Sequence, residues 1–152
     1  MSLPADIRLL AQPLDPPSEL ARFAAAHPGA GAIVSFLGQV RAEPGENAVI
    51  ALELSHYGPL TLGGMEALAA AAHARWSLDG LLVRHRIGSL EPAEPIVLVA
   101  AAARHRRAAF EAVDFLMDHL KSDAWLWKRE RTAAGWLWVE PRAEDHADRE
   151  RW

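Results

Sequence analysis

The chain has 152 residues, a formal net charge of -4, 51% hydrophobic and 24% charged residues, which fits one soluble globular domain spanning residues 1–152. Its negative charge gives no general attraction for nucleic acid or acidic membranes, so an anion site requires a local cluster of basic residues. The chain contains no cysteine, which excludes disulfides, zinc–thiolate sites and cysteine nucleophiles.

The first predicted elements are a strand and a helix. Residues 7–14 form a short apolar stretch that is typical of an edge strand. Asp15 can cap the amide groups of a helix over residues 15–27, and the two prolines that follow it fit a first turn, where no backbone donor is missed. A Pro-Gly pair directly after this segment ends the helix.

Two strands and a second helix are predicted next. Apolar residues alternate along residues 31–42, where Val34 lies on the more apolar face. The same alternation along residues 48–57, with Leu52 on the apolar face, predicts a strand that we expect to pair antiparallel with the previous one. An alanine-rich segment at residues 60–76 predicts a helix.

The second half of the chain predicts two hairpins around a long helix. Residues 80–88 and 94–103 predict strands joined by a short loop. Residues 105–121 predict the clearest helix, because apolar residues recur at helical spacing. Residues 124–140 predict a C-terminal hairpin, and the charged residues 141–152 predict a surface loop or short helix. This order of elements predicts an α+β fold with an antiparallel or mixed sheet and packed helices. The apolar positions of the long helix are Phe110, Val113, Leu116, Met117 and Leu120.

Four consecutive basic residues lie where an apolar strand passes into the long helix. They are Arg104, His105, Arg106 and Arg107. A helix N-terminus is already partly positive, so each exposed cation there costs about 0.3–1 kcal/mol unless a negative group is bound. The cluster therefore predicts a phosphate or carboxylate site. The alternative is that these arginines pair with the chain's own aspartates and glutamates.

Two lysines flank the most aromatic stretch of the chain. Lys121 ends the long helix, where a cation complements the helix dipole and needs no further role. In the predicted hairpin, Trp125 and Trp127 face one way, whereas Lys128 and Glu130 face the other. A half-buried lysine can act as an acid, base or nucleophile, and Glu130 is placed to hold it or to take its proton. A lysine that snorkels along a solvated face is an equally weighted alternative.

The remaining signals are weaker. Arg41 ends a strand, as many surface arginines do, and His85 has the pattern of a surface or packed residue. The seven histidines show no metal-ligand spacing, so we expect no metal site. Tryptophans near basic residues can stack on bases, but the stretch is short and the net charge negative, which argues against nucleic acid. No basic leader or membrane-length apolar run is present, so we expect a cytoplasmic protein.

Seven short stretches follow one another from about residue 30 to the end of the chain. They are GAIVSFLGQVR, LELSHY, the RW at 75–76, HRIGSL, RHRRAAFEAVDFLMDHLK, WKRE and the terminal RW. In this order and spacing they resemble the family of large, catalytic subunits of molybdopterin synthase. Any one of them alone is a weak signal, whereas the set is highly specific.

The resemblance implies an α/β hammerhead-type fold and a homodimer within a heterotetramer. Each copy would bind a small ubiquitin-like subunit whose C-terminal Gly-Gly carries a thiocarboxylate. That tail would give its sulfur to cyclic pyranopterin monophosphate and form the dithiolene of molybdopterin, with no other cofactor. Lys121 and Lys128 are the implied catalytic residues. The implied substrate-binding residues are Gln39, Val40, Arg41, His105, Arg106, Lys121, Lys128, Arg129 and Glu130.

A second class of function is also compatible with the sequence. In it the chain is a non-catalytic module whose arginines bind an anion or a partner's acidic tail, while exposed apolar surface serves dimerisation. The joint presence of Arg41, Lys121 and Lys128 favours the enzyme. Binding of a ubiquitin-like tail without conversion of the pterin would favour the module.

Overall fold

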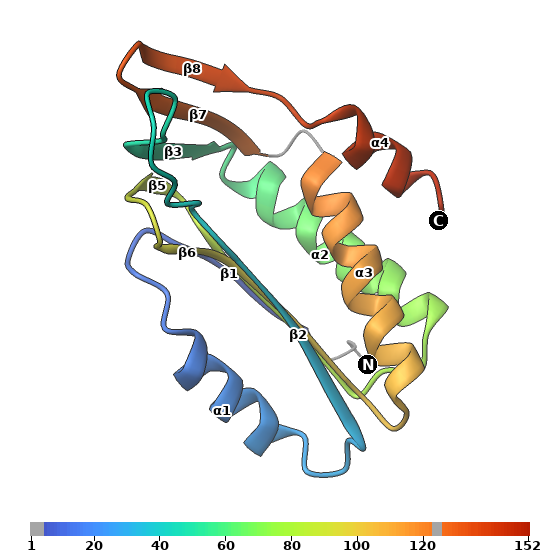
Figure 1. The fold of residues 1–152 in the computed structure, drawn as a ribbon. Coiled ribbons are helices and arrows are strands. Elements are labelled where there is room, and N and C mark those ends of the chain that lie inside the picture. Colours follow the sequence, from blue (N-terminus) through green and yellow to red (C-terminus); the bar gives the residue numbers. More distant parts are fainter. Residues whose placement is uncertain (1–4, 123–125) are drawn as a thin grey trace.

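The computed structural model describes residues 5–122 and 126–152, which form two four-stranded sheets and four helices (Figure 1). The strands are β1 (Ala5–Leu10), β2 (Ala32–Gln39), β3 (Ala51–His56), β4 (Gly80–Arg86), β5 (Gly88–Leu90), β6 (Pro95–Ala103), β7 (Leu126–Thr132) and β8 (Gly135–Val139). The helices are α1 (Pro16–Ala26), α2 (Pro59–Arg75), α3 (Arg106–Ser122) and α4 (Ala143–Arg149). Sheet A has the strand order β1-β4-β6-β2, and sheet B has the order β5-β3-β7-β8. The expected α+β class is confirmed, and none of the helices described is long and apolar enough to cross a membrane.

Sheet A is the central layer, with α1 on one face and α2 and α3 on the other (Figure 1). It is mixed, because β1 runs parallel to β4 whereas β6 pairs antiparallel with β4 and β2. Its strand β6 has small side chains: Ala101 and Ala103 lie in the core under α2 and α3, and Ala100 and Ala102 lie in the core under α1. All four are fully buried. Such short side chains let the helices pack close to the sheet.

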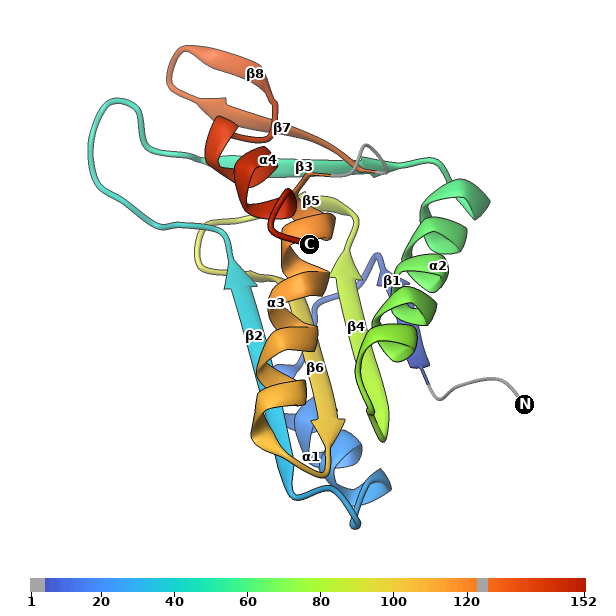
Figure 2. The same cartoon turned by 90° about the vertical axis from the view of Figure 1, so that its right-hand side faces the viewer.

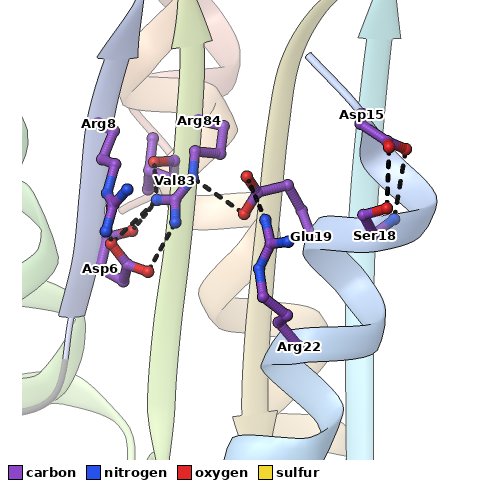
Figure 3. A network of polar contacts seen from close by, with 8 residues as sticks. All are labelled: Asp6, Arg8, Asp15, Ser18, Glu19, Arg22, Val83 and Arg84. Carbon is purple, nitrogen blue, oxygen red and sulfur yellow. Dashed lines mark hydrogen bonds and ion pairs between the residues drawn. The ribbon is translucent and has the colours of Figure 1, made fainter.

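One buried arginine ties three elements together on the α1 side of sheet A (Figure 3). Arg84 of β4 is 4% exposed, and its Nη2 lies 2.6 Å from Asp6 Oδ2 on β1. Its Nε donates to Glu19 Oε2 on α1 over 3.0 Å. Hydrogen bonding to Arg84 lowers the pKa of Asp6. Asp15 also caps α1 as predicted, since its carboxylate accepts from the Ser18 backbone amide.

The structure corrects the expected partner of residues 48–57. The strand in that segment, β3, belongs to sheet B, where it pairs with β5 on one side and β7 on the other instead of with β2. Its apolar residues Leu52 and Leu54 form a separate small core with Val40 and Leu90. Alternation along a strand fixes which face is buried but does not specify the partner, and β5 lies in the connection expected to be a simple loop.

The predicted C-terminal hairpin is confirmed as β7 and β8. Arg129 is the ladder partner of Trp138, so the two share the outer face of sheet B. Lys128 and Glu130 alternate with Arg129 and therefore lie on the inner face, as predicted. Trp125, which was expected on the face away from Lys128, lies outside the described residues.

The long predicted helix is α3, and its buried side includes Val113 and Leu116. Phe110, expected on the apolar side, is 53% exposed. The fully buried Ala109 and Ala112 face the core instead of Phe110. Their small side chains allow this part of α3 to lie close to the sheet.

The charged tail is a structured part of the fold. It forms α4, which packs against α3 near the C-terminal end of that helix (Figure 1). Arg151 Nη2 donates to Asp118 Oδ2 over 2.6 Å and to Asp114 Oδ1 over 3.1 Å. The indole Nε1 of Trp152 also donates to Asp118, and its ring packs edge-on against Phe115. These contacts fix α4 on α3.

Candidate functional site

A cavity of about 650 Å³ lies between one end of sheet A and the inner face of sheet B. In Figure 2, β2 and β4 run towards sheet B, and the C-terminal end of α3 meets it. A volume of this size suits a small molecule or the end of an extended peptide. Six of the nine implied substrate-binding residues line the cavity: Gln39, Val40, Arg41, Lys121, Lys128 and Glu130.

The end of β2 is shaped by a glycine. A Cβ atom at Gly38 would lie 2.9 Å from Val97 Cγ1, so a larger residue would displace the side chain of Val97 or the strand itself. The pairing of β2 with β6 also shifts its register between Gly38 and Gln39. Val40 is 4% exposed and anchors the segment in the small core of sheet B. Its neighbours Gln39 and Arg41 are thereby held at the cavity wall.

Both lysines of the chain line this one cavity. Lys121 and Lys128 are the only lysines among its 16 lysine and arginine residues. Lys121 stands in the last turn of α3, and Lys128 lies half-buried in the middle of β7. Although the Lys121 side chain is exposed, partial desolvation lowers the pKa of its ammonium group, and the positive charge of Lys128 lowers it further. Two consecutive elements, α3 and β7, thus place two amines in one cavity, where the charge of Lys128 acts on Lys121.

The cavity wall carries charges of both signs. Its cations are Arg41, Lys121, Lys128 and Arg142, and its carboxylates are Glu43, Glu130, Glu140 and Asp145. Glu43 pairs with Arg41 and Asp145 with Arg142, so both lysines remain to bind an anion. Among residues 5–122 and 126–152 no three metal-binding side chains come together to hold an ion. The arrangement can bind carboxylate-like and phosphate groups and can supply protons from amines.

His85 is a cavity residue that the sequence did not single out. It lies on β4 between two arginines, is 7% exposed and lines the cavity that holds Lys121. Its Nδ1 donates to the backbone carbonyl of Arg86 over 2.8 Å, which leaves Nε2 as the acceptor in the neutral ring. Burial lowers the pKa of His85 to about 4, and Lys121 contributes to that shift. The ring is therefore neutral at physiological pH, and its sequence context gave no signal of this.

His85 makes the stability of the fold sensitive to acid. Its pKa is about 4 in the fold and 6.5 in the unfolded chain, so the stabilisation is complete above pH 6.5 and is lost as the pH falls towards 4. The loss is about 3 kcal/mol. We expect His85→Asn, which keeps a donor near the position of Nδ1, to lose correspondingly less stability between pH 7 and 4 in urea unfolding at fixed protein concentration. Equal losses for both proteins would contradict this.

Arg129 is not brought to the cavity. It lies on the outer face of sheet B, where its guanidinium donates to both carboxylate oxygens of Glu53 over 2.9 and 3.0 Å. The same group stacks on Trp136, 4.2 Å from the ring centroid. The structure thus places Arg129 on the opposite side of β7 from Lys128.

His105 and Arg106 are also absent from this cavity. They lie at the N-terminal end of α3, and the 17 residues of that helix put them about 25 Å from its other end, where Lys121 stands. In the described part of the chain, no carboxylate forms an ion pair with Arg104, Arg106 or Arg107, so the alternative of pairing within the chain is not found.

A second cavity, of about 660 Å³, runs along α3 beside the edge strand β2. Arg106 and Arg107 line it near the start of α3, and Lys121 lines it at the other end. Phe36 and Phe110, which are 37% and 53% exposed, also line it. This open, partly apolar groove connects the two groups of implied site residues.

Comparisons with known proteins identify the family of the chain. Residues 9–123 match the family described as MoaE protein. The molybdopterin synthase catalytic subunit of Pseudomonas aeruginosa is 45% identical over 146 residues, which cover 96% of this chain and 97% of that protein.

Solved structures extend the agreement to the fold. The molybdopterin biosynthesis MoaE protein from Burkholderia ambifaria is 40% identical, with a TM-score of 0.82 over 97% of each chain. The molybdopterin synthase structure from Staphylococcus aureus is 25% identical, with a TM-score of 0.79 over 88% of this chain and 96% of that one. Since the family match, the identity and the fold agree over most of its length, the chain belongs to the MoaE family of molybdopterin synthase catalytic subunits.

Proposed function

We propose that this chain carries out the sulfur transfer of molybdopterin synthase in the cavity between its two sheets. Sulfur comes from the C-terminal thiocarboxylate of a small ubiquitin-like subunit. It goes to cyclic pyranopterin monophosphate and forms the dithiolene of molybdopterin. The observation that carries the proposal is the placement of Arg41 and both lysines of the chain around one cavity. A reaction between two anionic groups needs cations fixed around the reacting atoms, and this cavity supplies them.

The residues that line the cavity have different roles in the proposed reaction. Lys121 and Lys128 orient the thiocarboxylate, stabilise the charge that develops as sulfur attacks the pterin, and shuttle protons. Arg41 binds the substrate phosphate. Its Nε lies 3.1 Å from Glu43 Oε1 in an exposed pair, which an anionic ligand can replace at little cost. Gln39, Val40 and Glu130 complete the wall on which the substrate rests.

His105 and Arg106 enter this scheme through a second copy of the chain. The length of α3 keeps His105 and Arg106 away from the cavity between the sheets in their own copy. A two-fold axis across the groove along α3 would bring the start of one α3 to the end of the other, because such an interface is self-complementary. Two features support a homodimer there: β2 is an edge strand, and Phe36 and Phe110 are exposed beside it. In this arrangement His105 and Arg106 complete the partner's site.

The small ubiquitin-like subunit is the other partner in the proposal. Its Gly-Gly tail enters the cavity as an extended peptide, and one small subunit on each copy of the homodimer gives a heterotetramer. A cytoplasmic location, with which the absence of cysteine is compatible, is part of the same proposal.

The test is a reconstituted sulfur-transfer assay. The purified chain, a thiocarboxylated small subunit and cyclic pyranopterin monophosphate are expected to yield molybdopterin, with consumption of two thiocarboxylates for each product. A small subunit that ends in an ordinary carboxylate is the control and should give no product. If the chain binds the tail and never converts the pterin, the non-catalytic module is correct instead.

A further inference from the structure

The C-terminal helix contributes an acidic side chain to the site. Three residues line both cavities and so mark the place where they adjoin: Met117, Lys121 and Asp145. Asp145 is the carboxylate of this group, and its side chain is 13% exposed. It comes from α4, near the end of the chain, and lines with Lys121 the place where the cavity between the sheets adjoins the groove along α3.

The Asp145 carboxylate has a fixed orientation. Its Oδ2 accepts the backbone N–H of Arg142 over 2.9 Å, and its Oδ1 accepts Nη2 of the Arg142 guanidinium over 3.1 Å. The far end of the same tail is held on α3 by Arg151, which donates to Asp118 over 2.6 Å. Neither the carboxylate nor its helix is therefore free to turn away from Lys121.

The charges around Lys121 are of both signs. The titratable neighbours that line the cavity between the sheets are Arg41, Glu43, His85, Lys128, Glu130, Glu140, Arg142 and Asp145. His85 is neutral, and on α3 itself Asp118 already accepts from Arg151 and Trp152. Of the cavity carboxylates, Glu43 already pairs with Arg41, and Asp145 is the one that also lines the groove along α3. Without Asp145, Lys121 would lose the opposing charge at the junction of the two cavities, whereas Lys128 and Arg142 would remain.

We propose that Asp145 is a positioning residue that acts through Lys121, keeping its ammonium group charged and aimed at the junction of the two cavities. The catalytic meaning of this role rests on the proposed function of Lys121. A charged ammonium at the junction can hold the anionic tail from one cavity and an anionic substrate group from the other.

The electrostatics of the site point the same way. Burial and Lys128 lower the pKa of Lys121, Asp145 raises it, and Arg142 lowers it. Lys121 in turn contributes to lowering the pKa of Asp145. Asp145 and Arg142 therefore shift the pKa of Lys121 in opposite directions. Replacing one or the other should move that pKa in opposite directions, which tests the proposal.

The test uses the small number of lysines. The full chain labelled with [ε-¹³C]lysine gives one signal for Lys121 and one for Lys128, whose pH titrations report each pKa. We expect Asp145→Asn to move the Lys121 titration down by about one pH unit. Arg142→Gln should move it up, whereas Asp145→Glu should restore the wild-type value. Glu144→Gln removes the same charge from the adjacent exposed position of α4 and should leave it unchanged.

The outcomes separate this role from a structural one. If the substitutions only loosened α4, Asp145→Asn and Arg142→Gln would move the Lys121 titration in the same direction, and that result would overturn the proposal. An unchanged Lys121 titration in Asp145→Asn would also overturn it. In the sulfur-transfer assay, the alkaline limb of the pH–rate profile should shift with the Lys121 titration. The titration does not depend on turnover, so its failure is distinct from failure of the proposed function.

Discussion

Lys128→Ala is expected to slow sulfur transfer by about 10²- to 10⁴-fold, the range typical of losing a group that moves a proton or stabilises developing charge. Lys128 lies on the inner face of β7, which is paired with β3 on one side and β8 on the other. Truncating the side chain therefore leaves the cavity wall in place. Single-turnover formation of molybdopterin from the thiocarboxylated small subunit measures the chemical step apart from product release.

Arg131→Ala is the matched control for this change. Arg131 is a cation on the same strand, but it is exposed and alternates onto the outer face of sheet B. Its replacement should leave the rate at the wild-type level. A Lys128→Ala rate within about twofold of wild type would remove Lys128 from catalysis, and an effect confined to KM would make it a binding residue.

Mixing two inactive variants is expected to restore activity if the site is shared between copies. Lys121→Ala and Arg106→Ala should each damage both sites of their own homodimer. A mixed dimer would then contain one site with both defects and one intact site. Random reassociation of equal amounts gives mixed dimers in about half of the molecules, so activity should return to about one quarter of the wild-type level.

The control mixture combines Lys121→Ala with Lys128→Ala. Both lysines line the cavity of the same copy, so every site in that mixed dimer keeps one defect and activity should stay low. Distinct affinity tags allow the mixed dimers to be purified before the assay. Activity that stays low in the first mixture would show that Arg106 does not act across the interface, and recovery in the control would contradict the placement of the two lysines in one site.

Features coded by neighbouring residues could be predicted from the sequence. Asp15 begins α1 because a carboxylate before two prolines satisfies free amides wherever the helix lies. The alternation of Lys128 and Glu130 with Trp127 similarly placed the lysine on one face of a hairpin. The resemblance to a known family then identified six residues that the fold gathers around one cavity.

Features that depend on distant segments could not be predicted in this way. The pattern of β3 fits any partner with a complementary apolar face, so its place in sheet B followed only from the three-dimensional structure. His85 stands between two arginines, a context that favours exposure, yet β4 is buried along its whole length. Asp145 lies in a charged tail, and only the packing of α4 on α3 brings it to Lys121.

The alanines of β6 limit how this sequence can drift during evolution. Lys121 is carried by α3, which lies over the core that contains Ala101 and Ala103, whereas Lys128 is carried by sheet B. A valine at Ala101 would stay apolar but add two methyl groups in a fully packed interior, so α3 and its lysine would move relative to sheet B. Selection for activity therefore also constrains the alanines of β6, which contact no substrate, because they determine the distance between the amines of Lys121 and Lys128.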